Sequence, residues 1–419
     1  MLLWDETHPY NAVHVARVQA VCDAPRLERT LARVLEERGL TGLSIDAGGL
    51  RFEYGGGPAT VELKVVVDAA DPETALCGEI EREINTRFSR EGRFTPFRFF
   101  AVQDGASFWL GVVYFHAIAD AESVVRLVGE LVEDCLRDGA MAGRKRWECH
   151  AQIADRRPWR PGLWLRKLIA VGSQFRAMRK SNRPWCRDGD DMRNGFERFT
   201  LGGEVLAALK TASRAAGVTL NDLFLALLMR ALAPMAVAQG RPGRELMSLG
   251  CIVNARNDLG EDRPDVFGLA LGSFSVACRA AETGSVADLS REIFQQTRRL
   301  KRGGLYLANS LELLLTLRLM SFFSTNRRRR FYAKNYPLWG GVTNMNLSHF
   351  PNESPTTAPT DYLRAVSTGP ATPLVLSLTT FAGRVNCSVS YRTAFFSAAE
   401  VAWVKARLFC VIRELGVAV

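Results

Sequence analysis

SFWLGVVYFHAIADAESVVRLVGELVEDCLR, residues 107–137, holds a strand, a polar turn and a helix in one continuous run. The residues at 107–115 are almost all apolar or aromatic, which predicts a buried strand. From Ala121 onward the apolar residues recur at helical spacing, which predicts a helix over 121–137. His116 and Asp120 lie in the turn between the two elements. A strand that leads directly into a helix indicates a mixed α/β fold.

The flanking sequence carries the same two periodicities, so we expect further helices and strands on both sides of this run. In the first half these are a strand within 11–21, helices over 23–36 and 73–88, and strands over 51–55, 59–67 and 97–103. The strand at 97–103 is expected to form a hairpin with 107–115 across Asp104 and Gly105. In the second half we expect strands over 196–201, 246–253, 374–381 and 384–391, and helices over 203–216, 221–238 and 397–415.

The length of 419 residues exceeds what one compact core usually holds, so two lobes are expected. Residues 1–140 form the predicted first lobe, which carries His116 and Asp120. Residues 141–194 are rich in Arg, Trp and Pro and contain one helical run at 162–180, and we interpret them as a basic crossover linker. Residues 195–419 form the predicted second lobe.

The formal net charge of +10 is concentrated in two segments. Residues 141–200 carry 15 Lys or Arg against 6 Asp or Glu, and residues 291–334 include the run Arg327 to Arg330. Such patches suit the phosphates of coenzyme A, an acidic carrier protein or an anionic membrane, although a solvated basic face is an equal alternative. No nucleic-acid-binding signature accompanies the charge, so we expect no nucleic-acid partner.

The apolar run at 305–323 approaches the length of a membrane span. Asn309, Glu312 and Arg318 interrupt it, which favours a buried or amphipathic helix, with peripheral membrane binding as the alternative. Nine cysteines are scattered without a CxxC pair, so neither a metal site nor a disulfide framework is expected. The first residues, MLLWDETHPYNAV, lack the pattern of a signal peptide, and we expect a cytoplasmic protein.

His116 follows the end of an apolar strand, where an imidazole can reach a substrate and accept a proton from a hydroxyl or an amine. Asp120 is expected to pair with an arginine or with backbone amides and to hold the loop, rather than to pair with the imidazole. Two residues in five are a weak signal by themselves, and a structural histidine is the common alternative.

Together with its neighbours, however, HAIAD at 116–120 resembles the HHxxxDG motif of peptide-synthetase condensation domains and coenzyme A-dependent acyltransferases. The wider group of HxxxD acyltransferases includes wax-ester-synthase-like and polyketide-associated-protein-like relatives. Other landmarks follow in the family's order: GVTLNDLFLALLMRAL at 217–232, SLGCIVNARNDL at 248–259, FGLALGSFSVACRA at 267–280 and the closing stretch at 374–415. Phe115 stands where condensation domains carry their first histidine, and Ala121 replaces their glycine. Related acyltransferases also keep only the second histidine.

The resemblance implies an α/β (α+β) fold of two chloramphenicol-acetyltransferase-like lobes, each a mixed sheet covered by helices, with a substrate tunnel at their junction. It also implies acyl transfer from a thioester, on coenzyme A or a carrier protein, to a hydroxyl or amine acceptor, with His116 as general base and no separate cofactor. Asn254, Arg256, Thr343 and Asn344 are candidates for contacts at the tunnel or lobe junction, or for structural roles. A catalytically silent binding protein and a membrane-associated lipid-handling protein are the functional alternatives. Acyl chain length, oxyanion donors and oligomeric state stay open.

Overall fold

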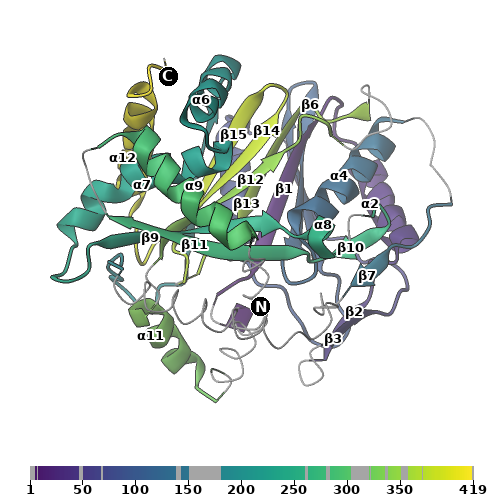
Figure 1. Ribbon diagram of the computed structural model, residues 1–419. Coiled ribbons are helices and arrows are strands. Elements are labelled where there is room, and N and C mark those ends of the chain that lie inside the picture. Colours follow the sequence, from purple (N-terminus) through teal and green to yellow (C-terminus); the bar gives the residue numbers. More distant parts are fainter. Residues whose placement is uncertain are drawn as a thin grey trace.

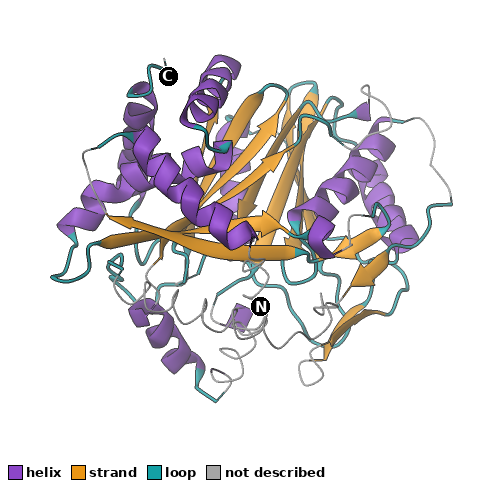
Figure 2. Ribbon diagram, in the orientation of Figure 1, coloured by secondary structure: helices purple, strands orange, loops and turns teal. Residues whose placement is uncertain are grey.

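The computed structural model has two β-sheets side by side, with helices on their outer sides (Figure 1; Figure 2). It describes residues 5–6, 8–46, 51–67, 69–137, 143–150, 181–259, 263–279, 284–302, 320, 322–335, 338–350, 357–369 and 371–417. The helical run expected at 162–180 and most of the apolar run expected at 305–323 lie outside these residues. The predicted α/β fold class is confirmed.

The first sheet has five strands in the order β13-β1-β6-β5-β4. Their bounds are Asp361–Val366 (β13), Asn11–Val18 (β1), Ser107–Phe115 (β6), Phe97–Asp104 (β5) and Leu63–Val66 (β4). The expected hairpin is present, because β5 and β6 pair antiparallel and Gly105 has the positive φ of 59° that a tight turn needs. The strand expected over 59–67 is shorter, starting at Leu63. Strands β2 (Leu43–Asp46) and β3 (Arg51–Tyr54) form a separate small sheet.

The second sheet has six strands in the order β11-β9-β12-β14-β15-β8. Their bounds are Leu271–Arg279 (β11), Leu246–Asn254 (β9), Leu338–Asn346 (β12), Leu374–Phe381 (β14), Arg384–Arg392 (β15) and Asn194–Leu201 (β8). Strand β12 pairs parallel with both β9 and β14, whereas the other pairs are antiparallel, so the sheet is mixed.

Two short strands cross from the later part of the chain to the first lobe. Strand β13 comes from the part of the chain assigned to the second lobe, yet it pairs with β1 at the edge of the first sheet. Strand β10 (Val266–Gly268) pairs with β7 (Glu148–His150), so residues that follow β9 reach across to the first lobe, where β10 lies beside α4 (Figure 1). Chain order therefore does not separate the two lobes cleanly, and the lobe boundaries expected from the sequence stay a prediction.

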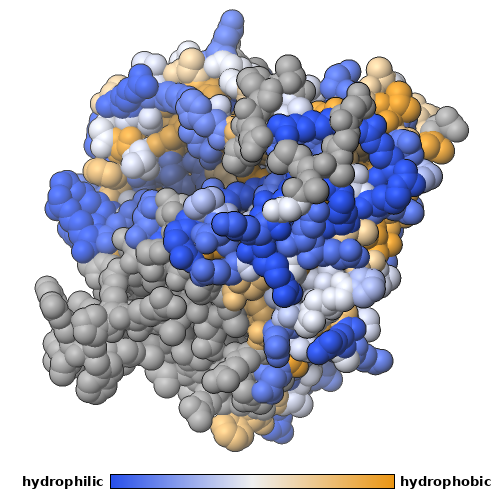
Figure 3. Space-filling model, turned by 90° about the vertical axis from the view of Figure 1, so that its right-hand side faces the viewer, coloured by the Kyte–Doolittle hydropathy of each residue, from blue (hydrophilic) through white to orange (hydrophobic). Residues whose placement is uncertain are grey.

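The helices of the first lobe begin at side-chain caps. Asp23 caps α2 (Ala24–Arg38), Asp71 caps α3 (Pro72–Asn85) and Asp120 caps α4 (Ala121–Leu136). The surface on the right-hand side of Figure 1 is largely hydrophilic where the structure describes it, which fits the polar outer face of such covering helices (Figure 3).

The second lobe contains α6 (Gly203–Ala216), α7 (Leu220–Ala238), α8 (Arg256–Leu259), α9 (Val286–Arg302), α11 (Thr325–Asn335) and α12 (Ala398–Arg413). Helix α7 is long and apolar enough to cross a membrane by length and composition, but most of its residues are buried in the second-lobe core, as in the central helix of many soluble proteins. Thr219 caps α7 and forms a capping box with Asp222, while Asn221 donates to Cys251 Sγ.

Candidate functional site

His116 follows the last residue of β6 and is fixed by its backbone and its ring. Its N–H donates to the Tyr10 carbonyl over 2.9 Å. The Tyr10 ring stacks on the imidazole with a centroid distance of 5.3 Å, and the Tyr114 ring meets it edge-on at 5.5 Å. The side chain is half-buried. These contacts hold the imidazole in one orientation at the end of the first sheet.

Of the two ring nitrogens of His116, Nδ1 is the one that has a hydrogen-bond partner among the described residues. Nδ1 lies 3.0 Å from the Ala119 carbonyl oxygen, which can only accept a hydrogen bond, so Nδ1 carries the proton and the neutral ring has its lone pair on Nε2. Burial lowers the pKa of His116, the bond to Ala119 and the charge of Asp120 raise it, and the charge of Arg364 lowers it. The net shift is downward, so the imidazole is neutral at pH 7 and Nε2 can accept a proton.

Asp120 points away from the imidazole and into a buried ion pair. Arg256 Nε donates to Asp120 Oδ2 over 3.1 Å, and Arg256 Nη2 donates to Asp120 Oδ1 over 2.8 Å. Both side chains are 1% exposed. The carboxylate also accepts from the N–H groups of Ser123 and Ala270, each over 2.9 Å. Asp120 therefore caps α4 and attaches the turn after His116 to the second lobe.

Ser123 and Gly268 complete what we call the Asp120 cluster: Asp120, Ser123, Arg256, Gly268 and Ala270. Gly268 donates its N–H to Ser123 Oγ, and that hydroxyl donates back to the Gly268 carbonyl, both over 3.0 Å. The Asp120 N–H also donates to the Gly268 carbonyl over 2.9 Å. Gly268 and Ala270 belong to the sequence landmark at 267–280, whereas nothing in the sequence sets Ser123 apart from other helical serines.

The two departures from the family motif are accommodated without strain. Phe115 is fully buried and packs against Phe88, with ring centroids 6.3 Å apart, so it fills the core on the opposite face of the sheet from Tyr114 and His14. Ala121 is the first residue of α4 and has no positive φ, so this position does not need a glycine.

The other residues that the sequence suggested for the tunnel or lobe junction differ in burial and in their contacts. Asn254 is exposed at the end of β9, and its Oδ1 accepts from the Arg256 N–H over 2.9 Å. Thr343 and Asn344 lie on β12, where Thr343 is half-buried opposite Ser377 and Asn344 is exposed opposite Leu378. Only Arg256 of these candidates contacts the Asp120 side chain in the described structure. The roles of all four stay predictions.

A second buried group lies near His116, and its members come from three strands that only the tertiary structure brings together. We call it the Arg364 cluster: His14 on β1, Tyr114 on β6, and Tyr362 and Arg364 on β13. His14 is paired directly opposite Arg364, and His14 Nδ1 lies 2.6 Å from the Tyr362 hydroxyl. The His14 and Tyr114 rings meet at 5.6 Å. Burial lowers the pKa of His14 far below its usual value, so this histidine is neutral.

A surface depression lies over α3, and none of its lining residues belongs to the Asp120 cluster or to the Arg364 cluster. Thr74, Cys77, Glu81 and Asn85 are among its lining residues, and neither His116 nor Asp120 contributes to it. It therefore gives no support to the substrate tunnel expected at the lobe junction, which stays a prediction.

No protein-family model and no curated protein matches the sequence significantly. Solved structures do match. The first condensation domain of the calcium-dependent antibiotic synthetase has a TM-score of 0.67 at 15% identity, with 98% of this chain and 92% of that chain covered. The TRI3 trichothecene 15-O-acetyltransferase from Fusarium sporotrichioides has a TM-score of 0.68 at 13% identity, with the same coverages of 98% and 92%. The SgcC5 protein from Streptomyces globisporus has a TM-score of 0.65 at 18% identity, covering 97% and 92%. The chain thus has the two-lobed fold of condensation domains and related acyltransferases, as the sequence resemblance predicted.

Proposed function

We propose that this protein is an acyltransferase, which moves an acyl group from a thioester donor to a hydroxyl or amine acceptor with His116 as general base. The observation that carries the proposal is the bond between His116 Nδ1 and the Ala119 carbonyl, which leaves the Nε2 lone pair for proton transfer. The neighbours in fold support the class of reaction, since one is named as an acetyltransferase and others as condensation domains.

In the proposed reaction, Nε2 takes the proton from the acceptor hydroxyl or amine as that atom bonds to the thioester carbonyl carbon. The carbon–sulfur bond of the resulting tetrahedral intermediate then breaks, and the imidazolium returns its proton to the leaving thiolate. The products are the ester or amide and the free thiol, so no net proton or electron is lost. The Asp120 cluster positions this step indirectly, because it fixes the turn that carries the Ala119 carbonyl.

The test is thiol release by wild type and His116→Ala, with coenzyme A donors of graded chain length and a panel of alcohols and amines. We expect acceptor-dependent release to fall by about 10²–10⁴ in the variant, because a general base contributes an effect of that size. His349→Ala is the matched control, since His349 is exposed. Equal release from wild type and His116→Ala would exclude His116 as the base. If neither releases thiol, carrier-protein thioesters are the next donors to test, and silence there favours the catalytically silent binding protein.

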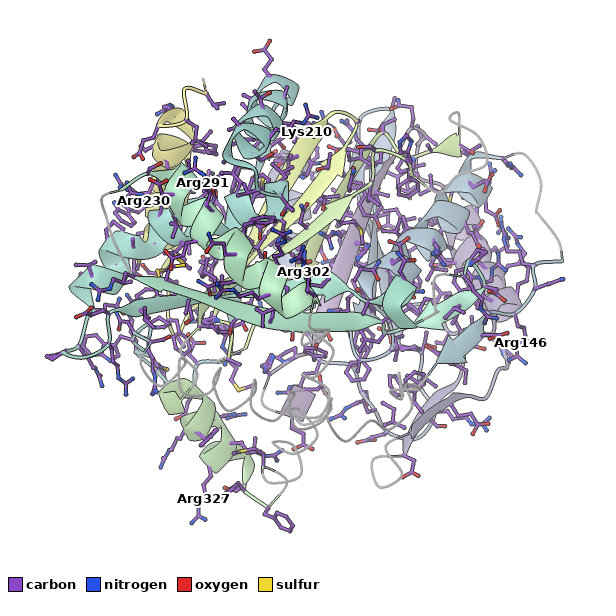
Figure 4. All side chains as sticks on the ribbon, in the orientation of Figure 1. Arg146, Lys210, Arg230, Arg291, Arg302 and Arg327 are labelled. Carbon is purple, nitrogen blue, oxygen red and sulfur yellow. The ribbon has the colours of Figure 1, made fainter. Side chains whose placement is uncertain are left out.

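A specific observation also favours peripheral membrane contact. Phe322, Phe323 and Phe331 are 84%, 43% and 37% exposed around the start of α11, beside the exposed Arg327 and Arg330. Arg327 points outward from the helix (Figure 4). Exposed aromatic residues next to arginines suit the interface of an anionic membrane, where each cation contributes about 1 kcal/mol.

Co-sedimentation with vesicles tests this contact. We expect binding to phosphatidylcholine vesicles that contain phosphatidylserine, weaker binding to phosphatidylcholine alone, and loss of binding in the double variant Phe322→Ser and Phe323→Ser. Trp185→Ser is the control, because Trp185 is a large apolar side chain that is also exposed, at 71%, and lies outside α11. Absence of wild-type binding to either vesicle, or unchanged binding of the double variant, excludes this surface as a membrane contact.

A further inference from the structure

Arg364 is a buried cation whose hydrogen-bond partners are all neutral. Its side chain is 6% exposed on β13. Nε donates to Thr379 Oγ1 over 3.1 Å, and Nη2 donates to the Leu378 carbonyl over 2.9 Å. In the described part of the chain, Arg364 forms no ion pair with a carboxylate, and its Nη1 has no hydrogen-bond partner.

Two other buried arginines have a carboxylate, whereas Arg392, among the described residues, donates only to the backbone carbonyls of Met192 and Asp191. Arg98, on the opposite face of the same sheet, lies 2.8 Å from Glu83, and Arg256 lies 2.8 Å from Asp120. A guanidinium does not lose its proton in a protein, and a buried charge without a counterion is costly. A binding role accounts for that cost, because a ligand can supply the missing negative charge.

The register of the first sheet places Arg364 on the same face as the residues that lead to His116. Arg364 is opposite His14, and His14 is opposite Val112 on β6. Tyr114 follows on that face and meets both imidazoles, with ring centroids 5.6 Å from His14 and 5.5 Å from His116. Two strand spacings, each about 4.8 Å, separate β13 from β6. Along β6, His116 lies four residues beyond Val112, a rise of about 13 Å. The charge of Arg364 still lowers the pKa of His116, so an extended substrate that contacts His116 can place a second group at Arg364.

The described residues around Arg364 supply no anion that pairs with it. Burial raises the pKa of both Tyr114 and Tyr362, so both phenols keep their protons, and His14 is neutral as described above. Glu122 is the one carboxylate whose charge is felt at Arg364 among the described groups, and it forms its ion pair with Arg126, over 3.7 Å. The region beside His116 is therefore electropositive.

We propose that Arg364 binds a carboxylate of a substrate, so that this protein uses either a hydroxy or amino acid as acceptor or a dicarboxylic acyl group as donor. The planar guanidinium matches the two oxygens of a carboxylate, and both hydrogens of Nη1 and the second hydrogen of Nη2 remain to donate. The inference rests on the proposed acyl transfer for the identity of the two substrates, but not for the binding itself.

The test is calorimetric binding to the His116→Ala protein, in which turnover is suppressed, with two pairs of probes. In the acceptor arm, 3-phenyllactate is compared with 3-phenyllactamide. In the donor arm, glutaryl-coenzyme A is compared with pentanoyl-coenzyme A. We expect the carboxylate member of one arm to bind about 10- to 100-fold more tightly than its neutral partner, as charge-assisted hydrogen bonds provide. The arm that shows the preference identifies the substrate that carries the carboxylate.

Arg364→Met, added to His116→Ala, is expected to remove the preference, and Arg364→Lys to restore part of it. Arg98→Met is the matched control, because Arg98 is equally buried but already paired with Glu83, and it should keep the preference. The carboxylate site is overturned if neither arm shows a preference, or if none of the four probes binds. Either result has this meaning even if acyl transfer is observed. A preference that depends on Arg364 in a protein without acyl transfer retains the site and overturns the proposed function.

Discussion

The Asp120 cluster and the Arg364 cluster each contain one buried arginine near His116, but their charges are balanced differently. Arg256 makes a two-point ion pair with Asp120 and further bonds to Ser123 Oγ and the Gly268 carbonyl. Among the described residues, the hydrogen-bond partners of Arg364 are one hydroxyl and one carbonyl.

This difference separates a structural charge from one that is available to a ligand. A charge whose partner is built into the protein holds two segments together, and its removal leaves the partner buried and unpaired. A charge without a built-in partner contributes little to folding and keeps its binding capacity. Predicted effects on stability are therefore large at Asp120 and small at Arg364.

The largest effect is expected for Asp120→Ala. It leaves the Arg256 cation buried without a counterion and removes the cap of α4, so we expect the free energy of unfolding to fall by about 3–5 kcal/mol. Urea denaturation measures this loss. The double variant Asp120→Leu with Arg256→Met is the control, and it should recover part of the stability because no unpaired charge remains. A double variant as unstable as the sum of the single ones would contradict this account of the ion pair.

Ser123→Ala should have an intermediate effect. The substitution leaves the Gly268 N–H without its acceptor and removes one of the groups bonded to Arg256, which corresponds to about 1–3 kcal/mol. The same denaturation experiment measures it, with the exposed Ser348→Ala as control. A change no larger than that of Ser348→Ala would show that water or a backbone shift replaces the hydroxyl.

Arg364→Met should change the free energy of unfolding by less than about 1 kcal/mol. Two hydrogen bonds to neutral groups are lost, but an uncompensated buried charge is removed at the same time. Arg98→Met is the comparison, and it should be clearly less stable because Glu83 loses a buried partner. A loss at Arg364 as large as at Arg98 would mean that Arg364 has a structural counterion after all.

The smallest effects concern the pH dependence of acyl transfer, where the two clusters should act in opposite directions. The neutral imidazole is the base, so kcat/KM falls as the pH drops through the pKa of His116, which lies below the ordinary value of about 6.5. Asp120→Asn removes a charge that raises this pKa, so the acid limb should move to lower pH. Arg364→Met removes a charge that lowers it, so the acid limb should move to higher pH. Shifts in the same direction would show that structural disturbance, not charge, dominates.

The sequence predicted most elements of the fold because their periodicities are local. The β5–β6 hairpin, the helices α4, α6, α7 and α12, and the closing pair β14–β15 all occur close to the predicted ranges. Strand β13 was not predicted, since DYLRAV is short and carries an arginine, and an element of six residues gives little periodic signal. His116 and Asp120 were singled out because strand, turn and helix are contiguous.

By itself, then, the sequence determined the two-lobed α/β architecture and the turn in which His116 lies, because both depend on neighbouring residues and on the order of motifs along the chain. Only the tertiary structure decided which arginine pairs with Asp120, and that β13 returns to the first sheet and brings Arg364 opposite His14. Asp120 and Arg256 are separated by 136 positions in the sequence, and His14 and Arg364 lie near opposite ends of the chain. Pairing over such separations depends on how whole sheets pack, and no local pattern of residue types encodes it.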